Sequence, residues 1–101
     1  MREVDVHTLN TAWTDNATVI DVREDFEYAR GRVPGATLIP LGELADRVHE
    51  VPRAGRVFVI CASGNRSQMG SMILAQAGHD AVSVAGGTAA WARSGYPLER
   101  G

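Results

Sequence analysis

The sequence contains no lysine, so all ten of its basic side chains are arginines. This absence excludes a P-loop phosphate site, a Schiff-base lysine and a Ser-Lys catalytic pair. No apolar run approaches the roughly 18 residues of a membrane span, and the longest, Val57 to Ile60, has the length of a strand. The N-terminal residues contain no apolar stretch that could serve as a signal peptide. We therefore expect a cytoplasmic protein that has no membrane partner.

Cysteine occurs only once, at Cys61. A single cysteine excludes an internal disulfide, a Cys-x-x-Cys redox pair and a multi-cysteine zinc or iron–sulfur site. The histidines His7, His49 and His79 lie far apart, and none is near another ligand at metal spacing. We therefore predict neither a metal nor a cofactor. The formal net charge of −2 offers no basic face for a phosphate backbone, so we expect no nucleic-acid partner.

The size and composition are those of one soluble globular domain. The chain has 101 residues, of which 45% are hydrophobic and 22% are charged, and such a chain can bury a core without disulfides. No Pro/Gly/Ser linker, internal repeat or low-complexity segment divides it. We expect a single domain over residues 1–101.

Short β-rich runs alternate with segments of helical period along the chain. The predicted strands are Glu3–Val6, Thr18–Val22, Thr37–Ile39, Arg56–Ile60 and Ala81–Val84. The predicted helices are Thr8–Thr14, Asp25–Arg30, Leu41–Val48, Ser67–Gly78 and Thr88–Ser94. The helix at 67–78 carries Met69, Met72 and Ile73 on one face and ends at a glycine suited to helix termination. This alternation predicts an α/β fold, in which a parallel sheet is covered by helices on both faces.

Two polar segments follow predicted strands. Asp21-Val22-Arg23 ends the second strand, and a small-residue turn of residues 61–67 joins the fourth strand to a helix. Because the carboxyl ends of parallel strands meet at one edge of a sheet, both segments are expected at the same edge. Ligands bind at such edges, so this edge is the predicted site.

The turn that follows Cys61 has the features of an anion-binding cradle. Its successive backbone N–H groups, backed by a helix N-terminus, can surround a negative charge. Gly64 permits an unusual backbone conformation, and Arg66 adds a permanent charge. The residues predicted to form this cradle are Ala62, Ser63, Gly64, Asn65, Arg66 and Ser67. A sulfur at the lip of this cradle is expected to be a thiolate, which makes Cys61 the predicted nucleophile.

Four segments of the chain resemble the signatures of single-domain rhodaneses, in the order of that family and over essentially the whole chain. They are Asp21–Glu24, Gly31–Ala36, Cys61–Ser67 and Gly86–Trp91. The resemblance implies the three-layer α/β/α rhodanese fold with a five-stranded parallel sheet. It also implies sulfurtransferase chemistry, in which Cys61 carries sulfur and the backbone from Ala62 to Arg66 cradles it. Asp21 and Arg23 match an Asp-x-Arg pair of the family that helps to hold the site together.

The chain departs from this pattern at Arg32, where many members of the family have histidine. The departure affects the local hydrogen bonding of the Gly31–Ala36 turn and leaves the chemistry of the site in place. Phosphatases and arsenate reductases of this architecture have their arginine one position later than Arg66, where Ser67 stands here. The shorter loop therefore resembles the branch that handles sulfur.

The resemblance implies a double-displacement reaction. The Cys61 thiolate takes sulfane sulfur from a donor such as thiosulfate, and the resulting persulfide passes it to a thiol or to cyanide. The expected partners are a small anionic sulfur donor and a thiol acceptor, with a protein persulfide as a further candidate. The same loop equally suits a persulfide carrier or a regulatory module that acts on another protein, so this alternative stays open.

Overall fold

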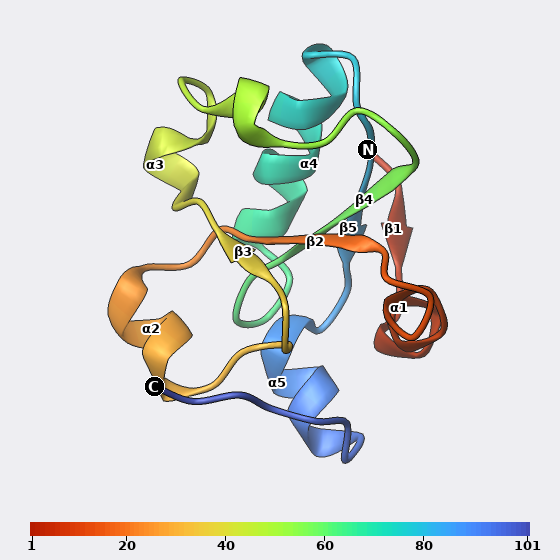
Figure 1. Ribbon diagram of the computed structural model, residues 1–101, viewed down its shortest axis with the longest axis vertical. Helices are drawn as coiled ribbons and strands as arrows, with labels where there is room; N and C mark the ends of the chain where they lie inside the picture. The colour runs from red at the N-terminus through yellow and green to blue at the C-terminus, as the bar shows by residue number, and fades with distance from the viewer.

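Strand β4 (Arg56–Ile60) occupies the centre of the fold because its side chains are apolar on both faces. Val57 and Val59 enter one half of the hydrophobic core, Phe58 and Ile60 enter the other, and all are buried. Such strands occur where helices cover both sides of a parallel sheet. The computed structural model describes all 101 residues and has this architecture (Figure 1).

The sheet has five strands, all parallel, in the order β1-β5-β4-β2-β3. The other strands are β1 (Glu3–Val4), β2 (Thr18–Asp21), β3 (Thr37–Leu38) and β5 (Asp80–Val84). The helices are α1 (Val6–Trp13), α2 (Asp25–Arg30), α3 (Leu41–Leu44), the 3₁₀ helix η1 (Val48–Glu50), α4 (Arg66–Gln76) and α5 (Gly87–Arg93). The predicted α/β/α fold with a five-stranded parallel sheet is confirmed.

The helices form a layer on each side of the sheet. In Figure 1, α3 and α4 lie above the strands, and α1, α2 and α5 lie below them. Leu44 of α3 and Leu74 of α4 are buried in one half of the core, whereas Leu9 of α1 and Trp91 of α5 are buried in the other. Cys61 belongs to the half that faces α4, so the chain turns from β4 into α4 directly over its side chain.

The first strand is shorter than predicted, because Asp5 caps the following helix. The Asp5 carboxylate accepts a hydrogen bond from the backbone N–H of Thr8, and α1 therefore begins at Val6. An aspartate at this position satisfies one of the free N–H groups at a helix start. The strand predicted to reach Val6 consequently ends at Val4.

The single helix predicted over Leu41–Val48 is wrong. Helix α3 ends at Leu44, and the chain continues through turns that join residues three apart into η1. Glycine at position 42 weakens a helix in its middle. The tighter path also brings Val51 into the core beside Leu44, which a continued helix would not do.

The buried face of α4 differs from the face that its apolar pattern indicates. Met69 and Met72 are 53% and 45% exposed, whereas Ser67, Gly70, Ser71 and Leu74 are buried. A small residue is needed at Gly70 because α4 lies close to the sheet there: a Cβ at this position would lie 3.0 Å from a methyl carbon of Val59.

The end of α4 is as predicted. Gly78 has a positive φ of 96°, and its N–H donates to the carbonyl of Ala75. The N–H of His79 donates to the carbonyl of Leu74. Together these bonds form a Schellman motif that ends the helix.

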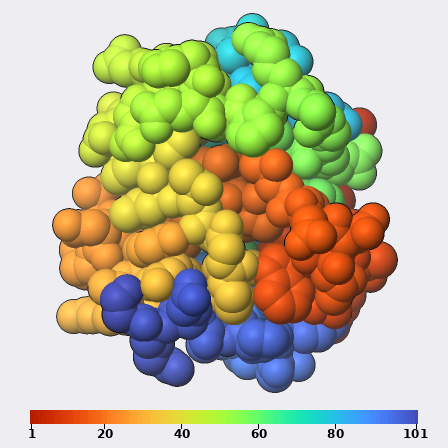
Figure 2. Space-filling model, in the orientation of Figure 1, coloured from red at the N-terminus to blue at the C-terminus, as the bar shows by residue number.

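The C-terminal segment is tied to α2 through Arg32, the residue that departs from the family pattern. Arg32 pairs with Glu99, donates to the carbonyls of Tyr28 and Gly101, and stacks on the Tyr28 ring. In Figure 2 the dark blue C-terminal residues lie against the orange surface of α2. Arg32 therefore holds the C-terminal segment against α2.

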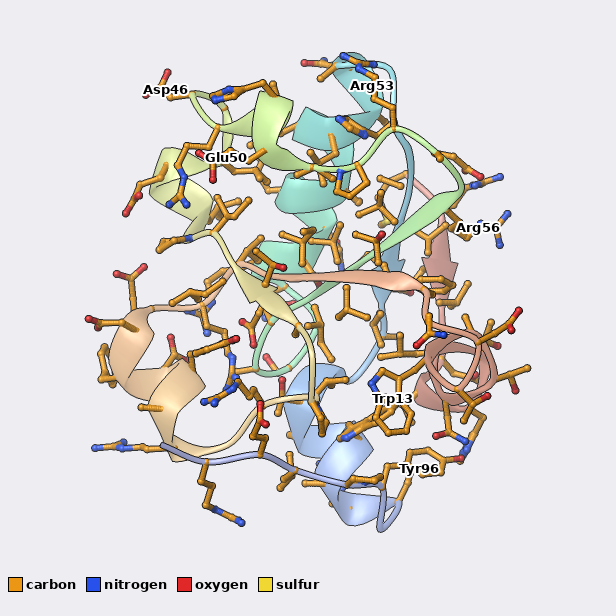
Figure 3. All side chains as sticks on the ribbon, in the orientation of Figure 1. Trp13, Asp46, Glu50, Arg53, Arg56 and Tyr96 are labelled. Carbon is orange, nitrogen blue, oxygen red and sulfur yellow. The ribbon has the colours of Figure 1, made fainter.

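An aromatic cluster lies on the same side of the sheet. The indole of Trp91 contacts Trp13 and Tyr96, which Figure 3 labels.

Candidate active site

The cradle loop and the Asp21–Arg23 segment lie at the same edge of the sheet. Asp21 and Ile60 are register partners at the carboxyl ends of β2 and β4, and the N–H of Val22 donates to the carbonyl of Ile60. The loop of residues 61–65 leaves this edge and enters α4 at Arg66. The edge is therefore the one at which ligands bind to parallel sheets.

The sulfur of Cys61 lies at the base of the loop rather than at its lip. Cys61 is only 1% exposed. Its Sγ accepts a hydrogen bond from the backbone N–H of Gly64 at 3.1 Å and lies 3.4 Å from the hydroxyl oxygen of Ser67. Gly64 has a φ of 105°, and a Cβ there would come within 3.0 Å of the backbone N of Gly86. Glycine is therefore required for the loop to fold around the sulfur.

Two opposing effects set the pKa of the Cys61 thiol. Burial raises it, because a thiolate loses hydration in the protein interior. Hydrogen bonds from the Ser67 hydroxyl and from the backbone N–H groups of Ser67, Gly64 and Ser63 lower it. The hydrogen bonds outweigh burial, so the pKa of Cys61 lies below its ordinary value. This favours the nucleophilic thiolate.

Ser67 is held in place by a residue that the sequence reasoning missed. The hydroxyls of Ser67 and Ser83 are 2.8 Å apart, and both residues are buried. Ser83 belongs to β5, and a serine within the apolar run from Ala81 to Val84 was the available signal. The hydrogen bond between them satisfies the buried hydroxyl of Ser83 and holds the hydroxyl of Ser67 beside Sγ of Cys61.

The start of α5 fixes the backbone on either side of the sulfur. The N–H and hydroxyl of Thr88 both donate to the Cys61 carbonyl, at 2.8 and 3.0 Å, and the N–H of Ala89 donates to the Ala62 carbonyl. A Cβ on Gly87 would lie 2.5 Å from the carbonyl oxygen of Cys61. The Gly86–Trp91 segment therefore contributes a close backbone approach that only glycine allows.

Asp21 and Arg23 form a buried pair beside the loop. Asp21 accepts hydrogen bonds from the backbone N–H of Arg23 and from its Nε and Nη2 atoms. The same Nη2 donates to the carbonyl of Gly31, at the end of α2. No hydrogen bond joins either side chain to Cys61. The pair thus connects β2 to α2, the helix that borders the loop.

The Arg66 side chain is paired with a carboxylate that the sequence reasoning did not include. Its Nη1 and Nη2 atoms donate to Oε1 and Oε2 of Glu27, each at 2.8 Å. Glu27 lies 39 residues earlier, on α2, and no local pattern in the sequence links the two positions. The other loop side chains do not point at the sulfur: Ser63 and Asn65 are exposed, and Ala62 is partly exposed. Glu27 therefore neutralises the positive charge of Arg66 at the edge of the cradle.

A cavity of about 330 Å³ borders the loop between α2 and α5. Its lining includes Arg23, Glu27 and Arg30 from the α2 side, Ala62 from the loop, and Thr88 from α5. A larger cavity, of about 480 Å³, lies at the opposite edge of the sheet, where β2 and β4 begin. Of these two cavities, the smaller one lies beside the loop that surrounds the Cys61 sulfur.

The structure contains no group of three histidine, cysteine, aspartate or glutamate side chains arranged to hold a metal ion. None of its helices has the length and apolar character needed to cross a bilayer.

A buried thiol encircled by a backbone loop, at the carboxyl edge of this parallel sheet, defines a rhodanese-like domain. The family model described as the rhodanese-like domain matches residues 6–94. The chain belongs to the rhodanese family.

Individual relatives agree with this assignment. A sulfurtransferase of Allochromatium vinosum is 34% identical over 101 residues, which cover 97% of this chain and 94% of the relative. The thiosulfate sulfurtransferase GlpE of Pseudomonas entomophila is 35% identical over 86 residues, or 84% of this chain and 78% of the relative. The crystal structure of a rhodanese-related protein from Thermoplasma volcanium superposes with a TM-score of 0.91 at 35% identity and covers 98% of both chains. The rhodanese-like sulfurtransferase family is therefore shown by sequence and by fold.

Proposed function

We propose that the protein is a sulfurtransferase that carries sulfane sulfur as a persulfide on Cys61. The observation that carries this proposal is the position of Sγ, which accepts an N–H from the loop and has a lowered pKa. A loop that stabilises a thiolate can equally stabilise the terminal sulfur anion of a persulfide, since both are negative sulfur atoms. Relatives named sulfurtransferase support the same chemistry.

The reaction runs in two displacements. In the first, the Cys61 thiolate bonds to the outer sulfur of a donor such as thiosulfate, and the sulfur–sulfur bond of the donor breaks. Sulfite leaves with the electron pair, and Cys61 becomes a persulfide. In the second, cyanide or a thiolate bonds to the terminal sulfur, and the Cys61 thiolate leaves. The thiolate is the reacting form, and the lowered pKa of Cys61 favours it, so no general base takes part in the step.

Within this proposal, the loop residues have distinct roles. The backbone from Ala62 to Arg66 and the hydroxyl of Ser67 hold the negative sulfur. The side chains of Ser63 and Asn65 point away from it and leave room for the loop to curve. Asp21 and Arg23 support the site from below, since they fix α2 beside the loop.

The test is steady-state kinetics with thiosulfate and cyanide. We expect parallel lines in double-reciprocal plots, the pattern of a ping-pong reaction. Cys61→Ser should lower kcat/KM at least about a thousandfold, because a serine hydroxyl is not ionised at neutral pH. Intersecting lines, or substantial turnover by Cys61→Ser, would contradict the covalent mechanism.

A persulfide carrier that exchanges sulfur only with another protein is the second candidate. One observation favours it: Arg66, the cation nearest the loop, is already paired with Glu27 and adds little attraction for small anions. Saturable turnover with a small donor supports the enzyme. Transfer to Cys61 only from a protein persulfide supports the carrier.

A further inference from the structure

Glu27 is fixed across the edge of the cradle by three hydrogen bonds. Both of its carboxylate oxygens accept from the Arg66 guanidinium, and Oε1 also accepts the backbone N–H of Glu24 at 3.0 Å. The Glu27 side chain is 21% exposed and that of Arg66 is 37% exposed. The pair is therefore an ordered part of the site rather than a transient surface contact.

This ion pair leaves the cradle with little positive charge. Arg66 is balanced by Glu27, and Arg23 is balanced by the buried carboxylate of Asp21. Of the arginines that line the cavity beside the loop, only Arg30 has no carboxylate partner. Arg53 and Arg56 lie at the far end of the molecule (Figure 3).

At the loop itself a sulfur donor therefore meets no unpaired arginine, and the one unpaired arginine of the cavity, Arg30, lies on its α2 side. Thiosulfate is a dianion and must approach the Cys61 thiolate, so its entry is opposed by repulsion. A free Arg66 would offset that repulsion, but its terminal nitrogens already donate to Glu27. A donor with a single negative charge meets about half the repulsion, because Coulomb energy is proportional to charge.

We propose that Glu27 sets the donor preference of the site, so that monoanionic sulfane-sulfur donors (thiosulfonates and thiol persulfides) are used in preference to dianionic thiosulfate. This inference rests on the proposed sulfur transfer to Cys61 and adds the class of donor. The step is the same for either donor: Sγ bonds to the outer sulfur, and the remaining group departs with the electron pair. That group is sulfinate from a thiosulfonate, a thiolate from a thiol persulfide and sulfite from thiosulfate.

Methanethiosulfonate and thiosulfate are matched probes, since they differ at the leaving group by one charge. With cyanide as the acceptor, Glu27→Gln should raise kcat/KM for thiosulfate about tenfold and for methanethiosulfonate about threefold. The ratio of the two constants therefore shifts about threefold toward thiosulfate. Glutamine keeps an acceptor for Arg66 and for the N–H of Glu24, so the local fold is preserved.

Two further variants separate charge from structure. Glu27→Asp retains the charge and shortens the side chain, so its donor ratio should stay near that of the wild type. Asp25→Asn removes one negative charge from the same helix at an exposed position without an ion pair, and it should also leave the ratio unchanged. In the double variant Glu27→Gln/Arg66→Gln the charges at positions 27 and 66 again sum to zero, as they do in the wild type. This variant should therefore restore the wild-type ratio of the two kcat/KM values.

The outcomes distinguish this inference from the proposed function. If neither donor places sulfur on Cys61 in any variant, the proposed function is wrong. If sulfur is transferred and Glu27→Gln leaves the donor ratio unchanged, only the role of Glu27 is wrong. An equal shift in Glu27→Asp or in Asp25→Asn would also overturn it, because the effect would then not follow the charge at position 27.

Discussion

At the scale of single residues, the pKa of the Cys61 thiol depends on a balance between burial and hydrogen bonding. A buried thiol without donors around it stays protonated and inert. Here the N–H of Gly64 and the hydroxyl of Ser67 both reach the sulfur, and Ser83 orients Ser67 from below. The site therefore stabilises the thiolate without a neighbouring histidine or lysine.

Ser67→Ala should raise the pKa of Cys61, because it removes a hydrogen bond that lowers this pKa while burial persists. The rate of alkylation by iodoacetamide, measured against pH, reports the thiolate fraction. We expect the profile of Ser67→Ala to move to higher pH and the rate at neutral pH to fall several-fold. A matched control is Ser63→Ala, whose side chain is exposed and whose backbone N–H is retained. An unchanged profile for Ser67→Ala would contradict this role.

How far the site could be predicted depends on the distance in sequence between its parts. Cys61, Gly64 and Ser67 lie within one short loop, so their spacing alone predicts a cradle. Glu27 meets Arg66 across 39 residues, and Ser83 meets Ser67 across 16. Such contacts are set by the packing of α2 and β5 against the loop, which no local pattern in the sequence encodes.

At the scale of elements, close packing rather than apolar periodicity decides which face of α4 is buried. The helix buries Gly70, where a Cβ would lie only 3.0 Å from a methyl carbon of Val59, and Ser71, and it exposes Met69 and Met72. Apolar spacing predicted the existence of this helix, and the glycine at position 78 predicted its end. It could not predict the orientation, because small residues are weak hydrophobic signals but strong packing determinants.

Leu74 and Met72 test that orientation directly. Leu74→Ala should lower the free energy of unfolding by about 3 kcal/mol, since it leaves a cavity under α4. Met72→Ala should lower it by less than about 0.5 kcal/mol, because this side chain is largely exposed. Urea unfolding of both variants measures the difference. Similar losses for the two variants would show that the buried face is wrongly assigned.

At the scale of the whole molecule, a few long-range contacts join segments that are distant in the chain. Arg32 ties the C-terminal segment to α2, and the Glu27–Arg66 pair ties α2 to the start of α4. The buried Asp21–Arg23 pair adds the link from β2 to α2. Helix α2 buries no residue fully, and these polar contacts add to the packing of its Tyr28 against the core in holding it beside the site.

The Glu27–Arg66 pair predicts a pH dependence of stability. Hydrogen bonds from Arg66 lower the pKa of Glu27 from 4.5 in a free carboxyl to about 2 in the folded protein. The pair therefore contributes stability above pH 4.5, and this contribution is lost as the pH falls toward about 2. Because both side chains are partly exposed, the contribution is about 1 kcal/mol or less.

Urea unfolding of the wild type and of Glu27→Gln, repeated from pH 7 to pH 2, tests this prediction. We expect the wild type to be the more stable protein at pH 7 and the two to converge at the acid end. A difference that stays constant over this range would show that the ionised carboxylate contributes no stability.

The most direct test of the central claim is the mass of the intact protein after brief exposure to a sulfane-sulfur donor and desalting. The account predicts a gain of one sulfur atom with methanethiosulfonate, its loss on addition of cyanide, and no gain in Cys61→Ser. Thiosulfate should give the same adduct more slowly. A protein that gains no sulfur from any donor and whose Cys61 resists alkylation at neutral pH would contradict the role assigned to Cys61.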